Sequence, residues 1–383
     1  MLRLAWVSPF PPERSGIADY SVDLVEALDG LAEVTLFAND VNTFQAPSLD
    51  HLNRWPIGTL SEKRFEFDLP VYQMGNHLLH RKIYQQALLN PGIVMLHELS
   101  LNGLFHGTIL QRPKVAQQRE IIYERPDSGK NGQLGLNSPT DLTFTQRLVD
   151  CALGVVAHSH FVADRLGDCE TKVLPFYGKS SDHVAPWPKR DGPHQPDIVF
   201  ACGGLITPAK QIDLVLDALQ QLVADGLNAQ LLLVGDVVPE VPLASWIAER
   251  NLADQVTVTG FVETIEQFES HLADADVVIN LRQPTMGETS AVVLRSMALG
   301  RPAIVFDEGW YGELPDCCVK IPSGSLTDLV QAMKTSAADL DKVQQMGEAC
   351  FAQIQAHHQP KKVAGELVGW IQETIDKIPL NLG

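Results

Sequence analysis

The chain has 383 residues and a formal net charge of −18, from 29 basic and 47 acidic side chains. This length is typical of about two domains, and the acidic balance argues against nucleic acid as a general partner. No apolar run is long enough to cross a membrane, and residues 1–7 do not resemble a signal peptide. We therefore expect a cytoplasmic protein of two domains, and a peripheral contact with a membrane stays open.

The cysteine pattern gives no sign of a structural zinc site. None of the six cysteines belongs to a Cys-x-x-Cys pair, the usual arrangement of such ligands. The neighbours Cys317 and Cys318 could oxidise, but a reduced pair is expected in the cytoplasm. No metal site is therefore predicted.

The first half alternates short apolar strands with amphipathic helices, which is the pattern of a parallel sheet. Expected strands cover residues 2–7, 34–37, 71–74, 93–96, 153–157 and 171–174, and expected helices cover 17–28, 80–89, 146–151 and 161–166. Residues 107–146 look irregular, and a loop of this length could shape an acceptor pocket.

Two positions in this half are candidate ligand contacts. Gly16 follows the first strand, where a ligand could come close to the backbone, although a plain turn glycine is the alternative. The surrounding loop lacks the G-x-G-x-x-G fingerprint, so a nicotinamide cofactor is not supported. His97 follows the strand 93–96 at its carboxyl end, the ligand-binding edge of an open parallel sheet. It could orient a substrate hydroxyl near neutral pH, or it could be a structural histidine bonded to a loop carbonyl.

A proline-rich stretch, residues 182–197, reads as the linker to a second doubly wound half. Strands are expected at residues 198–202, 230–234, 256–258, 277–281 and 303–306, and helices at 212–223, 243–250, 265–275, about 289–299 and 340–382. We expect a first domain at 1–185 and a second at 196–362. The end of the last helix, about 363–383, is expected to pack back on the first domain.

A strand–loop–helix–strand unit at residues 276–307 is the strongest site candidate. Its helix begins near Thr289 or Ser290, either of which can cap it. Unpaired amides and the helix dipole attract anions there, so we predict a phosphate or diphosphate site that includes Glu288. An ordinary capped connection between two strands is the alternative.

Among the other charged residues of this half, Lys210 is a site candidate, whereas Asp274 and Asp276 are not. Lys210 follows a glycine-containing loop at the carboxyl end of a strand, where it could neutralise a phosphate leaving group. The alternative for Lys210 is a solvated lysine at a helix start. Asp274 and Asp276 flank one residue, but they precede a strand, at the edge of the sheet where ligands do not bind. We therefore do not predict a metal site at these aspartates.

These motifs together resemble the glycosyltransferases of the GT-B fold, specifically glycosyltransferase family 4. The likeness covers nearly the whole chain and is strongest where family members read close to Leu-Glu-Ala-Met-Ala-x-Gly-x-Pro, here residues 294–302. The other matching segments are residues 9–12, 15–18, 75–76, 96–98, 204–210, 260–261 and 282–293. The implied fold is α/β, with two Rossmann-like doubly wound domains facing a central cleft.

The resemblance implies retaining transfer of a sugar from a nucleotide-sugar donor to an acceptor hydroxyl, without a cofactor or an essential metal. The acceptor would be a glycan, a lipid-linked sugar or a small molecule. His97, Lys210 and Glu288 would be catalytic. The implied donor-binding residues are Gly16, Gly204, Lys210, Phe261, Val262, Arg282, Glu288, Thr289 and Ser290.

Three positions depart from the family pattern. Two glutamates are usual, and their aligned places hold Gly287 and Arg295 here. Glu288 lies one step away and could replace the first, whereas nothing obvious replaces the second. The usual arginine aligns with Leu205, and we hypothesise that Arg282 supplies the missing charge. An inactive GT-B module that binds a nucleotide or glycan, and another GT-B enzyme such as a sugar-nucleotide epimerase, therefore stay open as alternatives.

Overall fold

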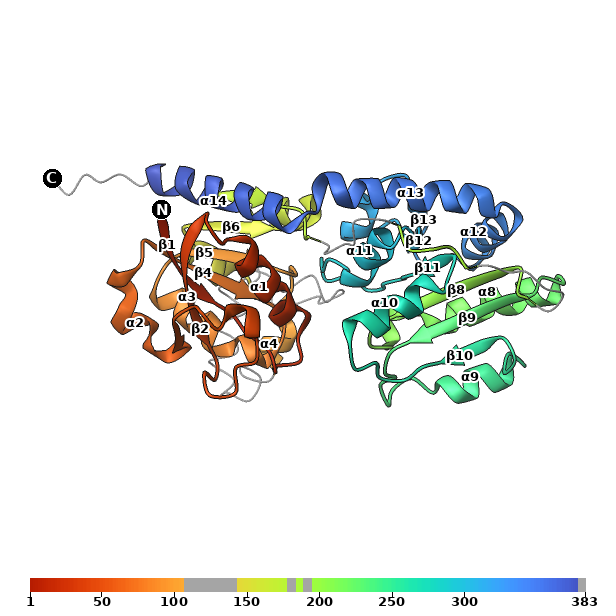
Figure 1. The fold of residues 1–383 in the computed structure, drawn as a ribbon. Helices are drawn as coiled ribbons and strands as arrows, with labels where there is room; N and C mark the ends of the chain where they lie inside the picture. Colours follow the sequence, from red (N-terminus) through yellow and green to blue (C-terminus); the bar gives the residue numbers. More distant parts are fainter. Residues whose placement is uncertain (107–142, 178–183, 189–194, 378–383) are drawn as a thin grey trace, which may run out of the picture. The chain divides into compact units, whose positions relative to one another are not determined.

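The computed structural model describes residues 1–106, 143–177, 184–188 and 195–377. The chain divides into two compact units, shown in Figure 1. Unit 1 consists of Met1–Phe176, Met286–Thr289 and Pro360–Gly383, and unit 2 consists of Tyr177–Thr285 and Ser290–Gln359. Most of the irregular stretch expected at 107–146 lies outside the described residues, and the predicted domain limits stay a prediction.

Unit 1 is built on a seven-stranded parallel sheet with the strand order β3-β2-β1-β4-β5-β6-β7. The strands are β1 (Leu2–Val7), β2 (Ala32–Ala38), β3 (Arg54–Pro56), β4 (Leu69–Met74), β5 (Ile93–Leu96), β6 (Gly154–Ala157) and β7 (Thr171–Val173). The helices are α1 (Gly16–Ala27), α2 (Leu60–Lys63), α3 (Arg81–Leu89), α4 (Asn102–His106), α6 (Gln146–Cys151), α7 (His160–Ala163) and α14 (Pro360–Lys377), with 3-10 turns η1 (Pro47–Leu49), η2 (Ile57–Thr59), η3 (Arg64–Glu66) and η4 (Leu78–His80).

The central strands of this sheet are apolar because helices cover both of its faces. All four residues of β5 and all four of β6 are buried. The sequence did not predict β3, a short edge strand that contains a proline. Proline is tolerated there because an edge strand does not need every amide for pairing.

The C-terminal helix α14 belongs to unit 1, where it packs against α1. A Cβ atom on Gly154 would come within 2.8 Å of the Trp370 ring, so β6 and α14 are in close contact. Figure 1 shows α14 running alongside β6. The expectation that 340–382 is helical is confirmed for the described residues up to 377, in two helices: α13 (Leu340–His357) ends before α14 begins at Pro360, a residue that favours the first position of a helix.

Unit 2 repeats the same topology in a six-stranded parallel sheet, ordered β10-β9-β8-β11-β12-β13. Its strands are β8 (Ile198–Gly203), β9 (Ala229–Val234), β10 (Val256–Val258), β11 (Val277–Ile279), β12 (Ala303–Phe306) and β13 (Val319–Ile321). Its helices are α8 (Ile212–Ala224), α9 (Leu243–Glu249), α10 (Ile265–Ala273), α11 (Ala291–Ala298), α12 (Leu326–Ala338) and α13, with 3-10 turns η6 (Pro208–Lys210) and η7 (Gly309–Glu313). The prediction of two successive doubly wound sheets is confirmed, although the sequence reading missed β13 and α12.

A buried arginine binds a segment near the start of unit 2. Arg301 is fully buried, and its guanidinium donates to the carbonyls of Pro186 at 2.7 Å, Ala273 at 2.9 Å and Ala275 at 2.9 Å. The guanidinium also lies 4.1 Å from the centre of the Trp187 ring. Burial lowers the pKa of Arg301 to about 10, so it stays charged at neutral pH.

Replacing Arg301 with methionine should strongly destabilise unit 2. The change leaves several buried carbonyls without donors, and we expect the free energy of unfolding to fall by about 3 kcal/mol in urea titrations. Arg250, which pairs with Asp217 at 2.6 Å near the surface, is the matched control. Arg250→Met should cost about 1 kcal/mol or less, and equal losses in the two variants would contradict the role given to Arg301.

Candidate functional site

The two central strands of unit 2, β8 and β11, lie side by side where the strand order reverses. Ligands of open parallel sheets bind beyond the carboxyl ends of the strands at such a reversal. Here β8 ends at Gly203, and Asn280 is the residue directly after β11. The candidate site is built from the side chains that gather around these two strand ends.

A hydrogen-bond chain links Lys210 to Ser290 at this place. The Lys210 ammonium donates to the Gly203 carbonyl at 2.6 Å and to Asn280 Oδ1 at 3.2 Å. Since an ammonium can only donate, the Asn280 amide must turn its nitrogen the other way, and Asn280 Nδ2 donates to Ser290 Oγ at 3.0 Å. Sequence analysis missed Asn280, although a single amide within the apolar run 277–281 was the available signal.

The backbone of the preceding loop delivers Lys210 to this position. Lys210 ends the 3-10 turn η6, and Gln211 then adopts the left-handed region at φ 52° before α8 begins. Lys210 therefore lies in the 3-10 turn just before α8 and not in the first turn of the helix. Gly204 has φ +82°, and a Cβ atom there would lie 3.7 Å from Lys210 Nζ. A side chain at Gly204 would thus be strained and would crowd the ammonium.

Ser290 caps α11, in agreement with one of the two predicted cap positions. Its Oγ accepts from the Val293 amide at 3.3 Å as well as from Asn280. Because the oxygen accepts both bonds, the hydroxyl hydrogen of Ser290 is left to donate to a third group. The first amides of α11 have no partner within the helix, so this end of α11 carries partial positive charge. The arrangement is suited to binding an anion.

The remaining predicted donor contacts of unit 2 surround the same edge of its sheet. Gly260 adopts φ +69° after β10. Phe261 is 59% exposed, whereas Val262 is half-buried against the core. Leu205, at the place of the family arginine, is 54% exposed and offers no charge. Arg282 is half-buried and lies three residues after β11, and its role stays a prediction.

The segment Met286–Thr289, which connects β11 to α11 along the chain, groups with unit 1. The Met286 carbonyl accepts from the Leu99 amide at 2.8 Å. A Cβ atom on Gly287, which has φ +79°, would come within 2.9 Å of a Val162 methyl group. A side chain at position 287 would therefore be strained and crowded.

The two polar residues that follow Gly287 have separate surroundings. Glu288 Oε2 accepts from the Met286 amide at 2.6 Å, so this carboxylate holds its own loop in place. Thr289 Oγ1 is buried and has no hydrogen-bond partner among the described residues. Binding of a diphosphate by either side chain stays a prediction.

The other missing glutamate is replaced by an ion pair. Arg295 on α11 contacts Glu269 on α10, with 2.5 Å between Arg295 Nη1 and Glu269 Oε1. The two side chains are 21% and 28% exposed. The charge at position 295 therefore has a structural partner, and α10 and α11 are joined at the place where family members carry a carboxylate.

In unit 1, His97 is buried and held by Gln73. Its Nε2 donates to Gln73 Oε1 at 2.8 Å, and Gln73 Nε2 donates to Met95 Sδ at 2.9 Å, which fixes the orientation of the amide. His97 Nδ1 is therefore an acceptor, and it has no hydrogen-bond partner among the described residues. Burial lowers the pKa of His97 well below 6.5, with His158 adding to the effect. His97 thus acts as a neutral acceptor and not as an imidazolium, and it does not bond a loop carbonyl.

A second buried histidine, which the sequence reading did not single out, stands beside it. His158 Nδ1 donates to the Leu174 carbonyl at 3.0 Å, and its Nε2 has no hydrogen-bond partner in the described part of the chain. The ring centres of His97 and His158 are 4.9 Å apart. Tyr20 and Phe176 pack against both rings. One aromatic cluster of unit 1 therefore contains two imidazole nitrogens, His97 Nδ1 and His158 Nε2, that can accept a hydrogen bond.

Gly16 forms the first residue of α1, which is capped by Ser15 through a 3.2 Å bond to the Ile17 amide. A Cβ atom on Gly16 would meet nothing within 4 Å, and the residue has no positive φ. Neither packing nor backbone conformation thus requires a glycine here. This finding leaves room for the predicted approach of a ligand to Gly16.

Comparison with known proteins gives a partial match to one family model and a shared fold. Residues 196–339 match the family model described as Glycosyl transferases group 1. This match covers less than half of the chain. No curated protein sequence matches the chain.

Solved glycosyltransferase structures share the two-domain GT-B fold across nearly the whole chain. Sucrose-phosphate synthase from Thermosynechococcus elongatus is 17% identical with a TM-score of 0.68, covering 98% of this chain and 100% of that one. HepE from Anabaena, in complex with UDP-glucose, is 14% identical with a TM-score of 0.67, covering 98% and 100%. A glycosyltransferase from Rickettsia africae is 13% identical with a TM-score of 0.68, covering 99% of each chain.

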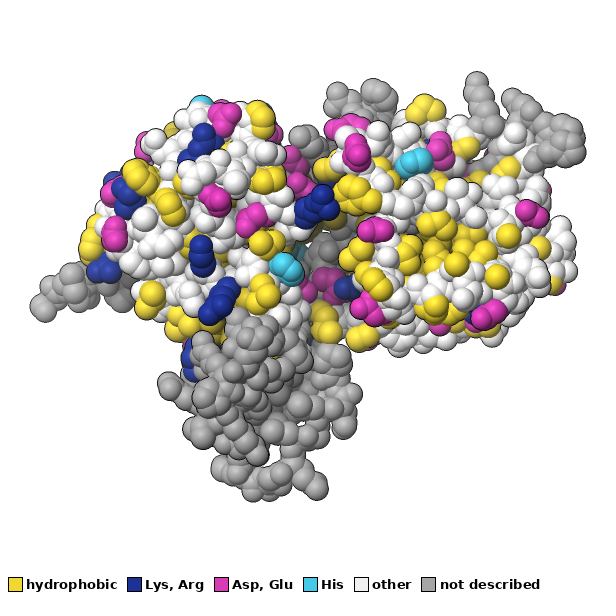
Figure 2. Space-filling view, turned by 90° about the horizontal axis from the view of Figure 1, so that it is seen from below, with side chains coloured by type: hydrophobic (Ala, Val, Ile, Leu, Met, Phe, Trp, Pro, Cys, Tyr) yellow, Lys and Arg dark blue, Asp and Glu magenta, His cyan; other side chains and the backbone are white. Residues whose placement is uncertain are grey.

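Two surface properties bear on possible partners. Figure 2 shows basic and acidic side chains interspersed on the visible face of unit 1, without a broad patch of one sign among the described residues. None of the helices in the described ranges combines the length and the apolarity of a membrane span.

The buried histidines predict that unit 1 loses stability in mild acid. Burial lowers the pKa of His80 and of His158 to about 4. Between pH 6.5 and 4 these histidines bind protons in the unfolded chain but not in the folded state. The free energy of unfolding therefore falls as the pH falls. Each histidine should cost about 2 kcal/mol at pH 5 relative to neutral pH, measured by urea unfolding.

In the variant His158→Gln, the loss of unfolding free energy between neutral pH and pH 5 should be smaller by about 2 kcal/mol, the contribution of one histidine. The same change at exposed His51 is the matched control and should leave the dependence of unit 1 stability on pH as it was. Equal unfolding free energies at pH 7 and pH 5 in the wild-type protein would contradict the burial of neutral imidazoles.

Proposed function

We propose that the protein is a retaining glycosyltransferase that moves a sugar from a nucleotide-sugar donor to an acceptor hydroxyl. The observation that carries the proposal is the chain of hydrogen bonds from Lys210 through Asn280 to Ser290 at the cap of α11. It brings an ammonium, a hydroxyl donor and a helix N-terminus to one edge of the sheet. These are groups that bind a diphosphate.

The chemistry required of such a site is stabilisation of a leaving group. When the bond between the sugar and the diphosphate breaks, negative charge develops on the departing phosphate oxygens. Lys210 and the amides of α11 would meet this charge without first having to reorganise. Because these groups already supply positive charge, we propose that the reaction does not depend on a metal ion.

Unit 1 offers complementary groups for a sugar. A neutral imidazole with a bare nitrogen accepts a hydrogen bond from a hydroxyl, and His97 Nδ1 and His158 Nε2 both have this form. We propose that His97 holds a hydroxyl of the transferred sugar and thereby orients it. Gly16, where an added Cβ atom would meet no atom of the described residues within 4 Å, would allow close approach of a ligand.

We propose a uridine diphosphate sugar as the donor. Structures of HepE from Anabaena are described with UDP and with UDP-glucose, and HepE shares the fold of this chain. The Gly260–Val262 backbone would contact the base, and Arg282 would supplement Lys210. We further propose a sugar or lipid-linked acceptor and a cytoplasmic location.

The direct test is incubation of the protein with a panel of nucleotide sugars and candidate acceptors, followed by analysis of the products. A glycosylated acceptor of retained anomeric configuration, with released nucleoside diphosphate, supports the proposal. The position of Leu205 and the Arg295–Glu269 ion pair favour one rival, a module that binds a nucleotide without turnover. Binding without product would establish that rival, and isomerised donor would indicate an epimerase.

Replacing Lys210 with methionine should weaken binding of a nucleoside diphosphate about 10- to 100-fold. A charge-assisted hydrogen bond of about 1.5–3 kcal/mol to the diphosphate is lost in this variant. Isothermal titration with UDP measures the change. The matched control for the loss of one positive charge is Lys334→Met, because Lys334 pairs with Asp225 at the C-terminal end of α8. Equal affinities of the two variants would contradict the role of Lys210.

A further inference from the structure

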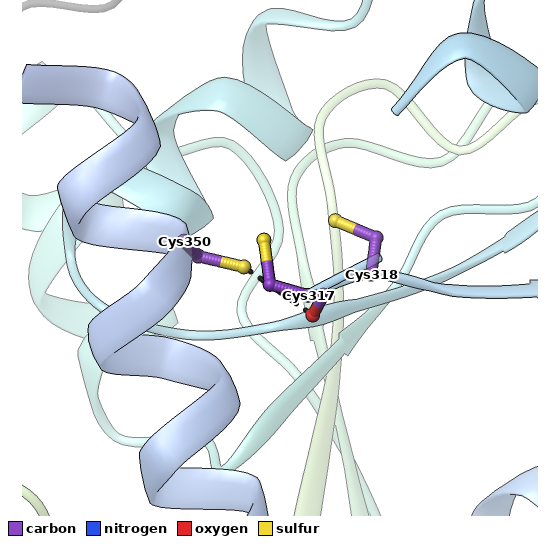
Figure 3. Close-up of side chains that lie close together, drawn as sticks. All are labelled: Cys317, Cys318 and Cys350. Atoms are coloured by element: carbon purple, nitrogen blue, oxygen red, sulfur yellow. Dashed lines mark hydrogen bonds between the residues drawn. The ribbon is translucent and has the colours of Figure 1, made fainter. Parts of the chain in front are cut away.

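A cluster of three cysteines lies in unit 2, formed by residues that are far apart in the sequence. Cys317, Cys318 and Cys350 are all buried, and their three sulfur atoms lie within 4.8 Å of one another. Figure 3 shows Cys350 reaching from α13 toward the two neighbouring cysteines that precede β13. None of the proposed steps of glycosyl transfer involves these thiols.

The backbone explains how two adjacent side chains can point to one place. Successive residues of an extended strand point to opposite faces of a sheet. Here the Cys318 amide donates to the Pro315 carbonyl at 2.9 Å, which closes a turn over residues 315–318. The turn brings both sulfurs to the same side, where α13 places Cys350.

The third cysteine is held in position by packing and by a hydrogen bond. The thiol of Cys350 donates to the Cys317 carbonyl at 3.4 Å, drawn as a dashed line in Figure 3. On the same helix Gly347 packs so tightly on the Gly300 carbonyl that a Cβ atom would approach it within 2.0 Å. The position of α13 against the end of α11 is therefore set by packing that does not involve the thiols.

We propose that Cys317, Cys318 and Cys350 form a binding site for a single thiophilic metal cation, with three sulfur ligands. Thiolate sulfur prefers soft cations such as Cu(I) over hard ones such as Mg²⁺. In the described ranges no fourth histidine, cysteine or carboxylate joins the group, which favours an ion that accepts three ligands over a tetrahedral zinc site.

The consequence of loading is local stabilisation of unit 2. The cation would tie the turn before β13 to α13, and α13 packs against α11, whose first turn is capped by Ser290. A ligand that binds only the folded state raises the melting temperature. The proposed site is thus a structural support for the donor-binding half and does not take part in chemistry.

The test uses the reduced full-length protein and Cd²⁺, a thiophilic ion that does not oxidise thiols. We expect one equivalent to bind, with a sulfur-to-cadmium charge-transfer absorption and a raised melting temperature, and Cu(I) supplied with a reductant should displace it. Each of the variants Cys317→Ala, Cys318→Ala and Cys350→Ala should weaken binding at least tenfold. The double variant Cys151→Ala/Cys169→Ala, which removes two thiols of unit 1, is the matched control and should bind as the wild type does.

The melting temperatures of the metal-free variants show whether each one folds. Should Cys350→Ala fail to fold, the more exposed Cys317→Ala carries the test. The proposal is overturned if the reduced protein binds no stoichiometric Cd²⁺, if binding survives all three single changes, or if Mg²⁺ competes equally.

Discussion

The candidate site depends on one buried amide. Asn280 is 4% exposed and contacts the Lys210 ammonium with its oxygen and the Ser290 hydroxyl with its nitrogen. An ammonium has no acceptor, so the orientation of the amide follows from chemistry alone. This orientation makes Ser290 an acceptor toward Asn280 and leaves its hydrogen directed to a further group. A positive charge, a hydroxyl donor and a helix N-terminus are thereby held in a fixed relation before any ligand arrives.

The fold places this amide where a parallel sheet can use it. Strand order reverses between β8 and β11, and Asn280 stands just beyond the end of β11. The same reversal occurs between β1 and β4 in unit 1, whose neighbouring strand β5 leads into His97. Each unit thus carries polar groups beyond the carboxyl ends of its central strands. In unit 2 these are suited to an anion, and in unit 1 they are neutral acceptors suited to hydroxyl groups.

Much of this could be predicted from the sequence because the signals were local. The apolar runs gave most of the strands, and the cap at Ser290 followed from the residues around it. Asn280 was missed because a single amide in an apolar run does not show which side chains it meets. The short edge strands β3 and β13 were missed, and in β3 the proline is a residue that argues against a strand.

Other features depend on contacts between distant segments, which a single sequence does not reveal. A side chain at Gly287 would be crowded by Val162, which lies far from it in the sequence. Arg295 has Glu269 as its ion-pair partner on the neighbouring helix. The nearness of Cys350 to Cys317 likewise appears only when α13 is in place.

The central claim is that Lys210 and Ser290 act as one anion-binding unit through Asn280. A double-mutant cycle on UDP affinity, with Lys210→Met, Ser290→Ala and the double variant, tests it directly by isothermal titration. We predict that the double variant loses less than the sum of the single losses, with an interaction energy of about 0.5 kcal/mol or more. Strictly additive losses, or single variants that bind UDP as tightly as the wild type, would contradict the account.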